Sequence, residues 1–314
     1  MSITYYKNIT LAFTLAFLIS CSTTNLAYNY ADFLVLNWFE SYVDLNESQR
    51  SDFKKKADNF FTWHRKSELP KVILFLEDIK FRYKGGLKKE DISWISDQSK
   101  IFWDRILNHI EEDLAAFLFT ISDSQVLQAK EAMLEKEDDW LIKQSKMTSD
   151  ELHSHVLSRL YEFLEDWMGS LEIHQKKQIS AWVKTDLNWI LIKLRNREKF
   201  QNDLINLLKY KHSLKDNIYS WIRYPSSHWT QEYKENIKDK KREWEEIAFK
   251  IDSNSLPSQR KRLIVKLDEL IEDFKDIAGI EGKVSKEKKS KSKINIKKFP
   301  LSHHSLPRPH LVLY

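Results

Sequence analysis

The sequence contains few of the residues that interrupt regular structure. It has five glycines and six prolines in 314 residues, and these two residue types supply many of the tight turns that connect strands. No stretch alternates convincingly between apolar and polar residues as a half-buried strand would. These absences argue against a sheet and favour long helices.

Cysteine occurs once, at Cys21, so an intramolecular disulfide and a Cys-x-x-Cys metal or redox site are both excluded. The chain also lacks a phosphate-binding glycine loop and a nucleophile-elbow sequence. We therefore expect no metal, no cofactor and no enzymatic activity. Stability must come from packing, for which the 11 tryptophans, 17 phenylalanines and 12 tyrosines provide ample apolar surface.

Positive charge is concentrated at the carboxyl end, although the whole chain has a formal net charge of +5. Residues 281–314 contain eight lysines and one arginine against two glutamates, and setting aside this tail and Lys7 leaves the helical part near −3. A body of that charge is not typical of a nucleic-acid-binding protein. The lysine- and serine-rich tail is predicted to be disordered, and its lysines are expected to contact anionic lipid or wall polymers.

Residues 1–20 have the layout of a secretory signal peptide. Lys7 precedes an apolar run from Ile9 to Ile19, and the small residue Ser20 ends the segment. The run is too short to span a bilayer as a helix, which takes roughly 20 apolar residues.

Leu18, Ile19 and Ser20 stand directly before Cys21, and this string resembles the lipobox of bacterial lipoproteins. The resemblance implies cleavage before Cys21 and a diacylglycerol on its thiol. Ser22 follows the cysteine, which by the same resemblance points to the outer membrane. The alternatives are an unlipidated secreted protein and an uncleaved N-terminal helix.

Helical periodicity accounts for the apolar residues of the rest of the chain and predicts an all-α bundle of about nine or ten helices over residues 31–280, without a sheet. Residues 21–30 are expected to form a tether. Capping boxes, in which an N-cap side chain is followed three residues later by Gln or Glu, are expected at residues 46, 122 and 148. The expected helices cover about 31–43, 46–68, 70–84, 90–119, segments beginning at 122 and 148, 172–195, 197–223, 230–251 and 257–278.

The helix expected at 31–43 is apolar around most of its circumference. This favours burial among other helices, with contact with lipid as the alternative.

Four strings taken together resemble the uncharacterised proteobacterial lipoproteins that are grouped as a domain of unknown function. The resemblance implies an all-helical, lipidated protein over roughly residues 18–280, and it brings no activity with it. Asp32, Asp44, Trp63, His64, Arg65 and Glu68 come from these strings and form the candidate functional cluster. The strings are Tyr28-Asn29-Tyr30-Ala31-Asp32, Tyr42-Val43-Asp44-Leu45, Trp63-His64-Arg65 and Glu68-Leu69-Pro70.

His64 and Glu68 are the candidates for acid–base chemistry, since an imidazole titrates near neutral pH. The favoured alternative is a structural corner at which Pro70 opens a new helix. In that interpretation Arg65 pairs with Glu68, and a backbone carbonyl binds the imidazole.

The expected function is a non-enzymatic scaffold or interaction module that faces the periplasm and has an envelope protein as a partner. A second hypothesis is a chaperone-like binder of unfolded envelope proteins. It comes from the spacing of Leu45 to Gln49 and of Ile121 to Gln125, which is similar to turns in the small periplasmic chaperones of the Spy and CpxP type. A third is a hydrolase built around His64 and Glu68.

Overall fold

The structure is a computed structural model that describes residues 23–137, 141–213 and 215–280. Within these ranges the chain forms helices and turns and no strand, so the all-α prediction is confirmed. None of the described helices combines the length and the hydropathy that a membrane crossing requires. Leu18 to Cys21, and the tail predicted at 281–314, lie outside the described residues.

Helices from the first half of the chain are long and mostly joined by short turns. They are α2 (Thr23–Asn29), α3 (Ala31–Glu40), α4 (Glu47–Trp63), the π-helix η1 (His64–Glu68), α5 (Leu69–Lys84), α6 (Lys89–Phe119) and α7 (Asp123–Glu137).

The second half continues in the same manner. It comprises α8 (Leu141–Ser145), α9 (Ser149–Met168), α10 (Ile173–Trp182), α11 (Leu187–Lys209), α12 (Lys215–Arg223), the 3₁₀ helix η2 (Pro225–His228), α13 (Gln231–Ser253) and α14 (Pro257–Ala278).

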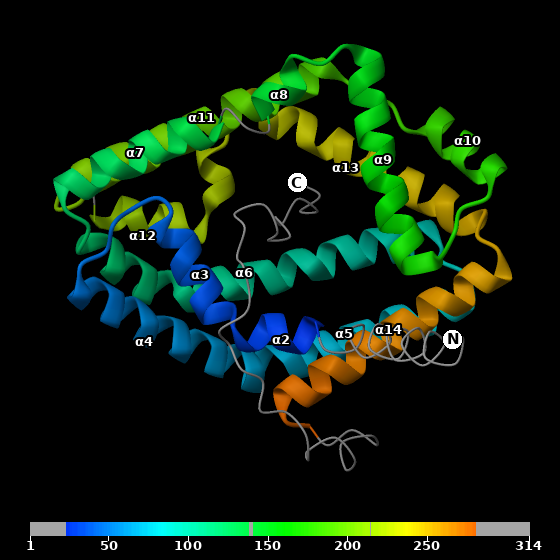
Figure 1. The fold of residues 1–314 in the computed structure, drawn as a ribbon, viewed down its shortest axis with the longest axis horizontal. Coiled ribbons are helices and arrows are strands. Elements are labelled where there is room, and N and C mark those ends of the chain that lie inside the picture. Colours follow the sequence, from blue (N-terminus) through cyan, green and yellow to red (C-terminus); the bar gives the residue numbers. More distant parts are fainter. Residues whose placement is uncertain (1–22, 138–140, 214, 281–314) are drawn as a thin grey trace, which may run out of the picture.

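The helices follow a ring-like outline in Figure 1. Along one long side lie α7, α8 and α11, and along the other lie α4, α5 and α14. At one end α3 and α12 connect the two sides, at the other end α9, α10 and α13 do so, and α6 runs lengthwise. Helix α14 packs along α5, and α12 packs along α6.

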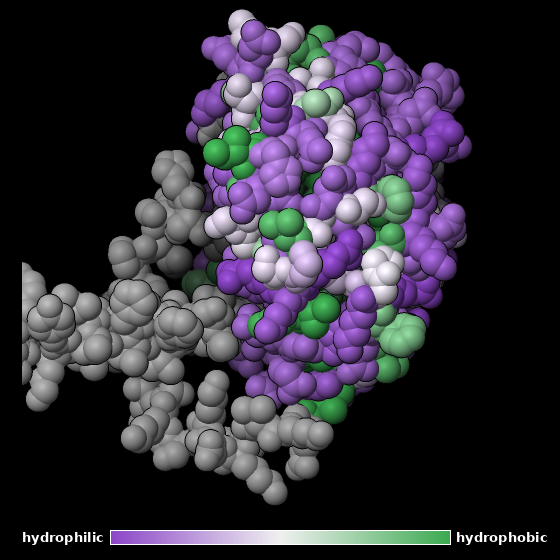
Figure 2. Space-filling model, turned by 90° about the vertical axis from the view of Figure 1, so that its right-hand side faces the viewer, coloured by the Kyte–Doolittle hydropathy of each residue, from purple (hydrophilic) through white to green (hydrophobic). Residues whose placement is uncertain are grey.

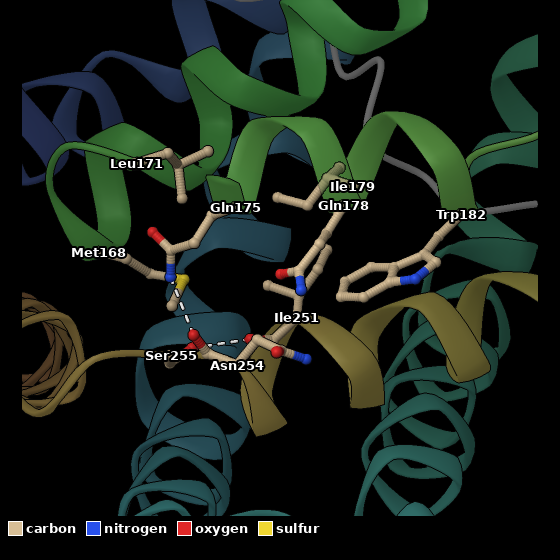
Figure 3. A pocket seen from close by; sticks show the side chains of 9 residues that line it. All are labelled: Met168, Leu171, Gln175, Gln178, Ile179, Trp182, Ile251, Asn254 and Ser255. Carbon is tan, nitrogen blue, oxygen red and sulfur yellow. Dashed lines mark hydrogen bonds between the residues drawn. The ribbon is translucent and has the colours of Figure 1, made fainter. Parts of the chain in front are cut away.

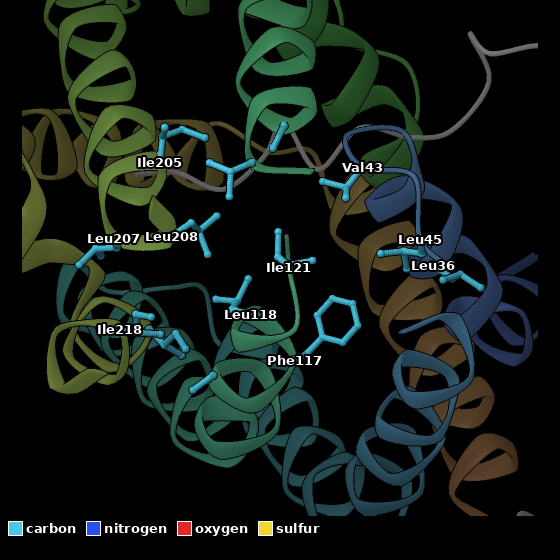
Figure 4. Packing of buried hydrophobic residues seen from close by; sticks show 14 residues of the cluster. Leu36, Val43, Leu45, Phe117, Leu118, Ile121, Ile205, Leu207, Leu208 and Ile218 are labelled. Carbon is cyan, nitrogen blue, oxygen red and sulfur yellow. The ribbon is translucent and has the colours of Figure 1, made fainter. Parts of the chain in front are cut away.

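Two main apolar clusters hold this arrangement together. The first joins α3, α6, α7, α11 and α12 around Phe117, Leu118 and Ile121, as Figure 4 shows. The second joins α9, α10 and α13, and Ile179 is among its most buried members. Full burial of one such side chain stabilises the fold by roughly 1.5–3 kcal/mol, so each cluster is a substantial part of the core.

Several local expectations differ from the structure. The helix expected over 197–223 is interrupted, since α11 ends at Lys209 and α12 begins at Lys215. The break expected between residues 195 and 197 is absent, and α11 instead begins after Asp186, whose carboxylate accepts the backbone N–H of Asn188 at 2.9 Å. This Asp186 cap was not recognised in the sequence. The residues expected to form a tether include α2, which contacts α14.

Pro70 does not make the expected corner. The chain stays helical from α4 through η1 into α5. Within η1 the N–H of Leu69 donates to the carbonyl of His64, five residues back. A proline in a regular helix clashes with the carbonyl four residues before it, and the wider π turn just before Pro70 gives that ring space without ending the helix.

Candidate functional site

The π-helix η1 brings several of the predicted residues together with α2 and α6. The Tyr28 hydroxyl lies 2.6 Å from Nδ1 of His64, and the Arg65 guanidinium lies 5.4 Å from the centre of the Tyr28 ring. Trp63 stacks on His109 of α6 with ring centres 3.6 Å apart and planes at 7°. This group of aromatic and basic side chains fixes α2 to the body of the protein.

Glu68 is the buried charge of this group, with an exposed fraction of 2%. The Arg105 guanidinium donates to both carboxylate oxygens, at 2.8 and 2.7 Å, and Lys71 donates to one of them at 2.9 Å. A two-point contact of this kind is among the stronger side-chain hydrogen-bonding arrangements in proteins. Glu68 therefore joins η1 to α6.

Two details of the expected arrangement are wrong. Glu68 pairs with Arg105 and Lys71 rather than with Arg65, and the imidazole of His64 contacts the Tyr28 hydroxyl rather than a backbone carbonyl. The π turn explains the first difference, because its wider helical repeat shifts the side-chain register that an α-helix would have.

Burial controls the ionisation of this group. It lowers the pKa of His64 below its usual value, against the opposing effect of the Glu68 charge. It raises the pKa of Tyr28 to about 12, although Arg65 nearby acts in the opposite direction. At neutral pH the group thus combines a neutral imidazole with a protonated phenol.

Asp32 and Asp44 lie near the two ends of α3, outside η1. Asp32 is in the first turn of α3. Asp44 is in the turn before α4, where its carbonyl oxygen accepts the side-chain amide of Gln125 at 2.7 Å and its carboxylate accepts Gln128 at 3.2 Å. Asp44 therefore contacts α7 rather than the residues around η1, so the predicted cluster is not one site.

Gln49 and Gln125, here called the first glutamine pair, meet in the core beside Asp44. Each side-chain amide donates to the carbonyl oxygen of the other, at 2.9 and 2.8 Å. Gln49 also donates to the backbone carbonyl of Thr120 at 2.9 Å. Each side-chain oxygen accepts the N–H of its own helix N-cap, Asn46 at 3.1 Å and Ser122 at 2.9 Å.

Gln175 and Gln259, the second glutamine pair, repeat this arrangement at the other end of the molecule. Their amides donate to each other at 2.9 Å in both directions. Gln175 donates to the carbonyl of Asn254, as Figure 3 shows, and Gln259 donates to that of Ser170, both at 2.9 Å. Again each oxygen accepts the N–H of its helix N-cap.

Both pairs therefore use one design. Two helix N-termini face each other, with a glutamine at the third position of each helix. The side-chain oxygen of each glutamine accepts the N–H of its own N-cap residue, and its amide donates to a backbone carbonyl in the turn before the partner helix. The amide donors and acceptors are satisfied within the protein, as buried polar groups require. The first pair links residues 76 positions apart and the second links residues 84 apart.

The pocket beside the second pair is too small for a substrate. It is lined by Gln175, Trp182 and Ile251 among others and encloses about 10 Å³. Ligand pockets typically measure about 300–1,000 Å³, and roughly 10–15 Å³ is needed for one water molecule. Among the described residues, no three metal-ligating side chains come together.

The fold and these contacts define an all-helical protein whose helix turns are joined through buried glutamines. A model of a family of unknown function, DUF6279, matches residues 41–234, which is more than half of the chain. The chain belongs to this family. The expectation that it belongs to a family of unknown function is therefore confirmed. The match includes His64, Glu68 and three of the four paired glutamines. No curated protein and no solved structure matches the chain.

Proposed function

We propose that this protein is a lipoprotein of the outer membrane that faces the periplasm and acts as a non-enzymatic helical scaffold or interaction module. The observation that carries the proposal is Cys21, the only cysteine, placed after Leu18, Ile19 and Ser20 at the end of a short apolar run. A thiol can form a stable thioether with a diacylglycerol. Two or three acyl chains at about 0.8 kcal/mol per buried CH₂ make such an anchor effectively permanent.

The contacts of the best acid–base candidates support a structural role. The Glu68 carboxylate is engaged by Arg105 and Lys71, and Nδ1 of His64 is engaged by Tyr28. A hydrolase needs these groups to converge on a substrate with a reactive proton or water within hydrogen-bond reach. Here both groups instead hold helices together.

The buried glutamines weaken the case for a chaperone. Gln49 and Gln125 motivated that hypothesis, and their pairing gives both of them a structural role. A binder of unfolded proteins is also expected to expose a large apolar patch. Figure 2 shows that the end of the molecule formed by α10 and its neighbours is mainly hydrophilic, with small separate apolar areas, so this end does not provide such a patch.

The lysine-rich tail would give the anchored protein a second, weaker contact. Each lysine close to an anionic membrane contributes on the order of 1 kcal/mol, and salt screens this attraction. We therefore include anionic lipid or wall polymer among the partners of residues 283–298, with an envelope protein as the main partner of the helical body.

Cross-linking in intact cells followed by affinity purification tests the scaffold. We expect one envelope protein to be recovered reproducibly with the wild-type chain, and to be lost with a Cys21→Ser variant that cannot be anchored. An empty purification, together with suppression of client aggregation at near-stoichiometric amounts of purified protein, would replace the scaffold with the chaperone.

A further inference from the structure

Helix α3 exposes an apolar surface that packing leaves uncovered. The exposed fractions are 42% for Tyr30, the N-cap residue, 47% for Phe33, 41% for Val35 and 58% for Trp38. Leu36 is the one residue of the helix that is buried. The expectation that this segment is a core helix therefore holds for the side of Leu36 and is wrong for the exposed side.

The exposed face of α3 carries no charge. With about 100° of rotation per residue, Tyr30, Val35 and Trp38 share one side of the helix and Leu36 lies on the other, while Phe33 falls between Leu36 and Tyr30. The two acidic residues of α3, Asp32 and Glu40, fall on the side of Leu36. Glu40 is held there by Arg50 at 2.7 Å. The outward side thus combines aromatic and aliphatic groups and lacks the charges that usually cover a solvent-facing helix.

This face lies close to the anchoring cysteine along the chain. Only Ser22 separates Cys21 from the first described residue, Thr23, and two residue steps reach at most about 7 Å. The seven residues of α2 add about 10 Å, and Figure 1 shows α3 leaving the end of α2. Since Tyr28 fixes α2 to His64 and α2 contacts α14, the position of α3 near the anchor is set by packing.

We propose that the exposed face of α3 lies flat in the interfacial layer of the bilayer that holds the lipid anchor. This inference rests on the proposed lipidation of Cys21. Tryptophan and tyrosine favour the membrane interface, because their rings are apolar while the indole N–H and the phenol can still reach water. The bilayer would then orient the helical body rather than merely tether it.

Site-specific fluorescence on the full-length lipoprotein tests this inference. A lipidated Cys21 has no free thiol, so a cysteine introduced by Val35→Cys or Trp38→Cys is the only position that a maleimide dye can label. Phe81→Cys is the matched control, because Phe81 is 77% exposed on α5. Each labelled protein is reconstituted into vesicles of phosphatidylethanolamine and phosphatidylglycerol, with and without a nitroxide-labelled lipid.

Dyes at positions 35 and 38 should emit at shorter wavelength than the dye at 81 and lose most of their intensity to the nitroxide lipid. Water-like emission at 35 and 38 in anchored protein overturns the inference and leaves the lipoprotein proposal standing. Short-wavelength emission that nitroxide lipid does not quench overturns it in favour of a protein contact. Labelling of the wild-type chain shows an unmodified Cys21 and overturns both proposals.

Discussion

Replacing Gln49 with leucine should be among the most damaging single changes in the core. The side chain is buried, and its removal leaves the N–H of Asn46, the carbonyl of Thr120 and part of the Gln125 amide without their partners. A buried polar group left unpaired costs about 1–3 kcal/mol. Since water can reach some of these groups, we expect Gln49→Leu to lower the free energy of unfolding by about 2–4 kcal/mol.

The pair should also behave as a unit. Once Gln49 is gone, Gln125 has already lost two of its hydrogen bonds. Gln125→Leu should therefore cost less in the Gln49→Leu background than in the wild type, with a coupling free energy of about 1–3 kcal/mol. Urea unfolding followed by circular dichroism measures all four members of the cycle.

Gln128→Leu is the matched control, because Gln128 contacts the same Asp44 turn from the solvent side at 3.2 Å. It should change the free energy of unfolding by less than about 0.5–1 kcal/mol. If Gln49→Leu and Gln125→Leu cost no more than Gln128→Leu, or if their effects simply add, the glutamine pair does not hold the helices together and our reasoning is refuted.

Three further changes probe other contacts by thermal or urea unfolding. Arg105→Leu should cost about 2–3 kcal/mol, because it leaves the Glu68 carboxylate buried with Lys71 alone, and an equal loss in a Glu68→Gln background would contradict this. Burial lowers the pKa of His64 and of His109, so below about pH 6.5 the unfolded chain binds more protons than the folded protein and stability should decrease as the pH falls. The decrease should be shallower in His64→Gln. An unchanged slope would show that His64 does not contribute. Gly169→Ala should cost about 1–3 kcal/mol, since Gly169 has φ +82° and an added Cβ would lie 3.0 Å from the Arg262 side chain. The control Gly85→Ala, at φ −90°, should be nearly neutral. Equal effects of the two changes would exclude backbone strain at Gly169.

Local signals made much of the fold predictable. The helices beginning after Asn46, Ser122 and Thr148 start where their capping boxes indicated, because a cap depends on residues within one turn. The ends of α6 and α14 were also close to expectation. Pro70 misled the prediction, since whether a proline ends a helix or is accommodated by a π turn depends on the tertiary contacts around it.

The glutamine pairs could not be predicted from neighbouring residues alone. Gln49 and Gln125 were recognised as capping residues, but their contact joins segments far apart in sequence. One signal was available, namely the recurrence of glutamine at the third position of several helices. Gln259, after a leucine N-cap, was not recognised as part of that set. The Arg105 partner of Glu68 was missed for the same reason, since α6 is a separate segment.

Mass spectrometry of the mature N-terminus, combined with membrane fractionation, tests the central claim most directly. The lipoprotein proposal predicts that the first residue is Cys21, that its thiol carries a diacylglycerol and its amine an acyl chain, and that the protein is recovered with the outer membrane. An unmodified Cys21 in a soluble periplasmic protein, or an intact segment before it, would contradict the account.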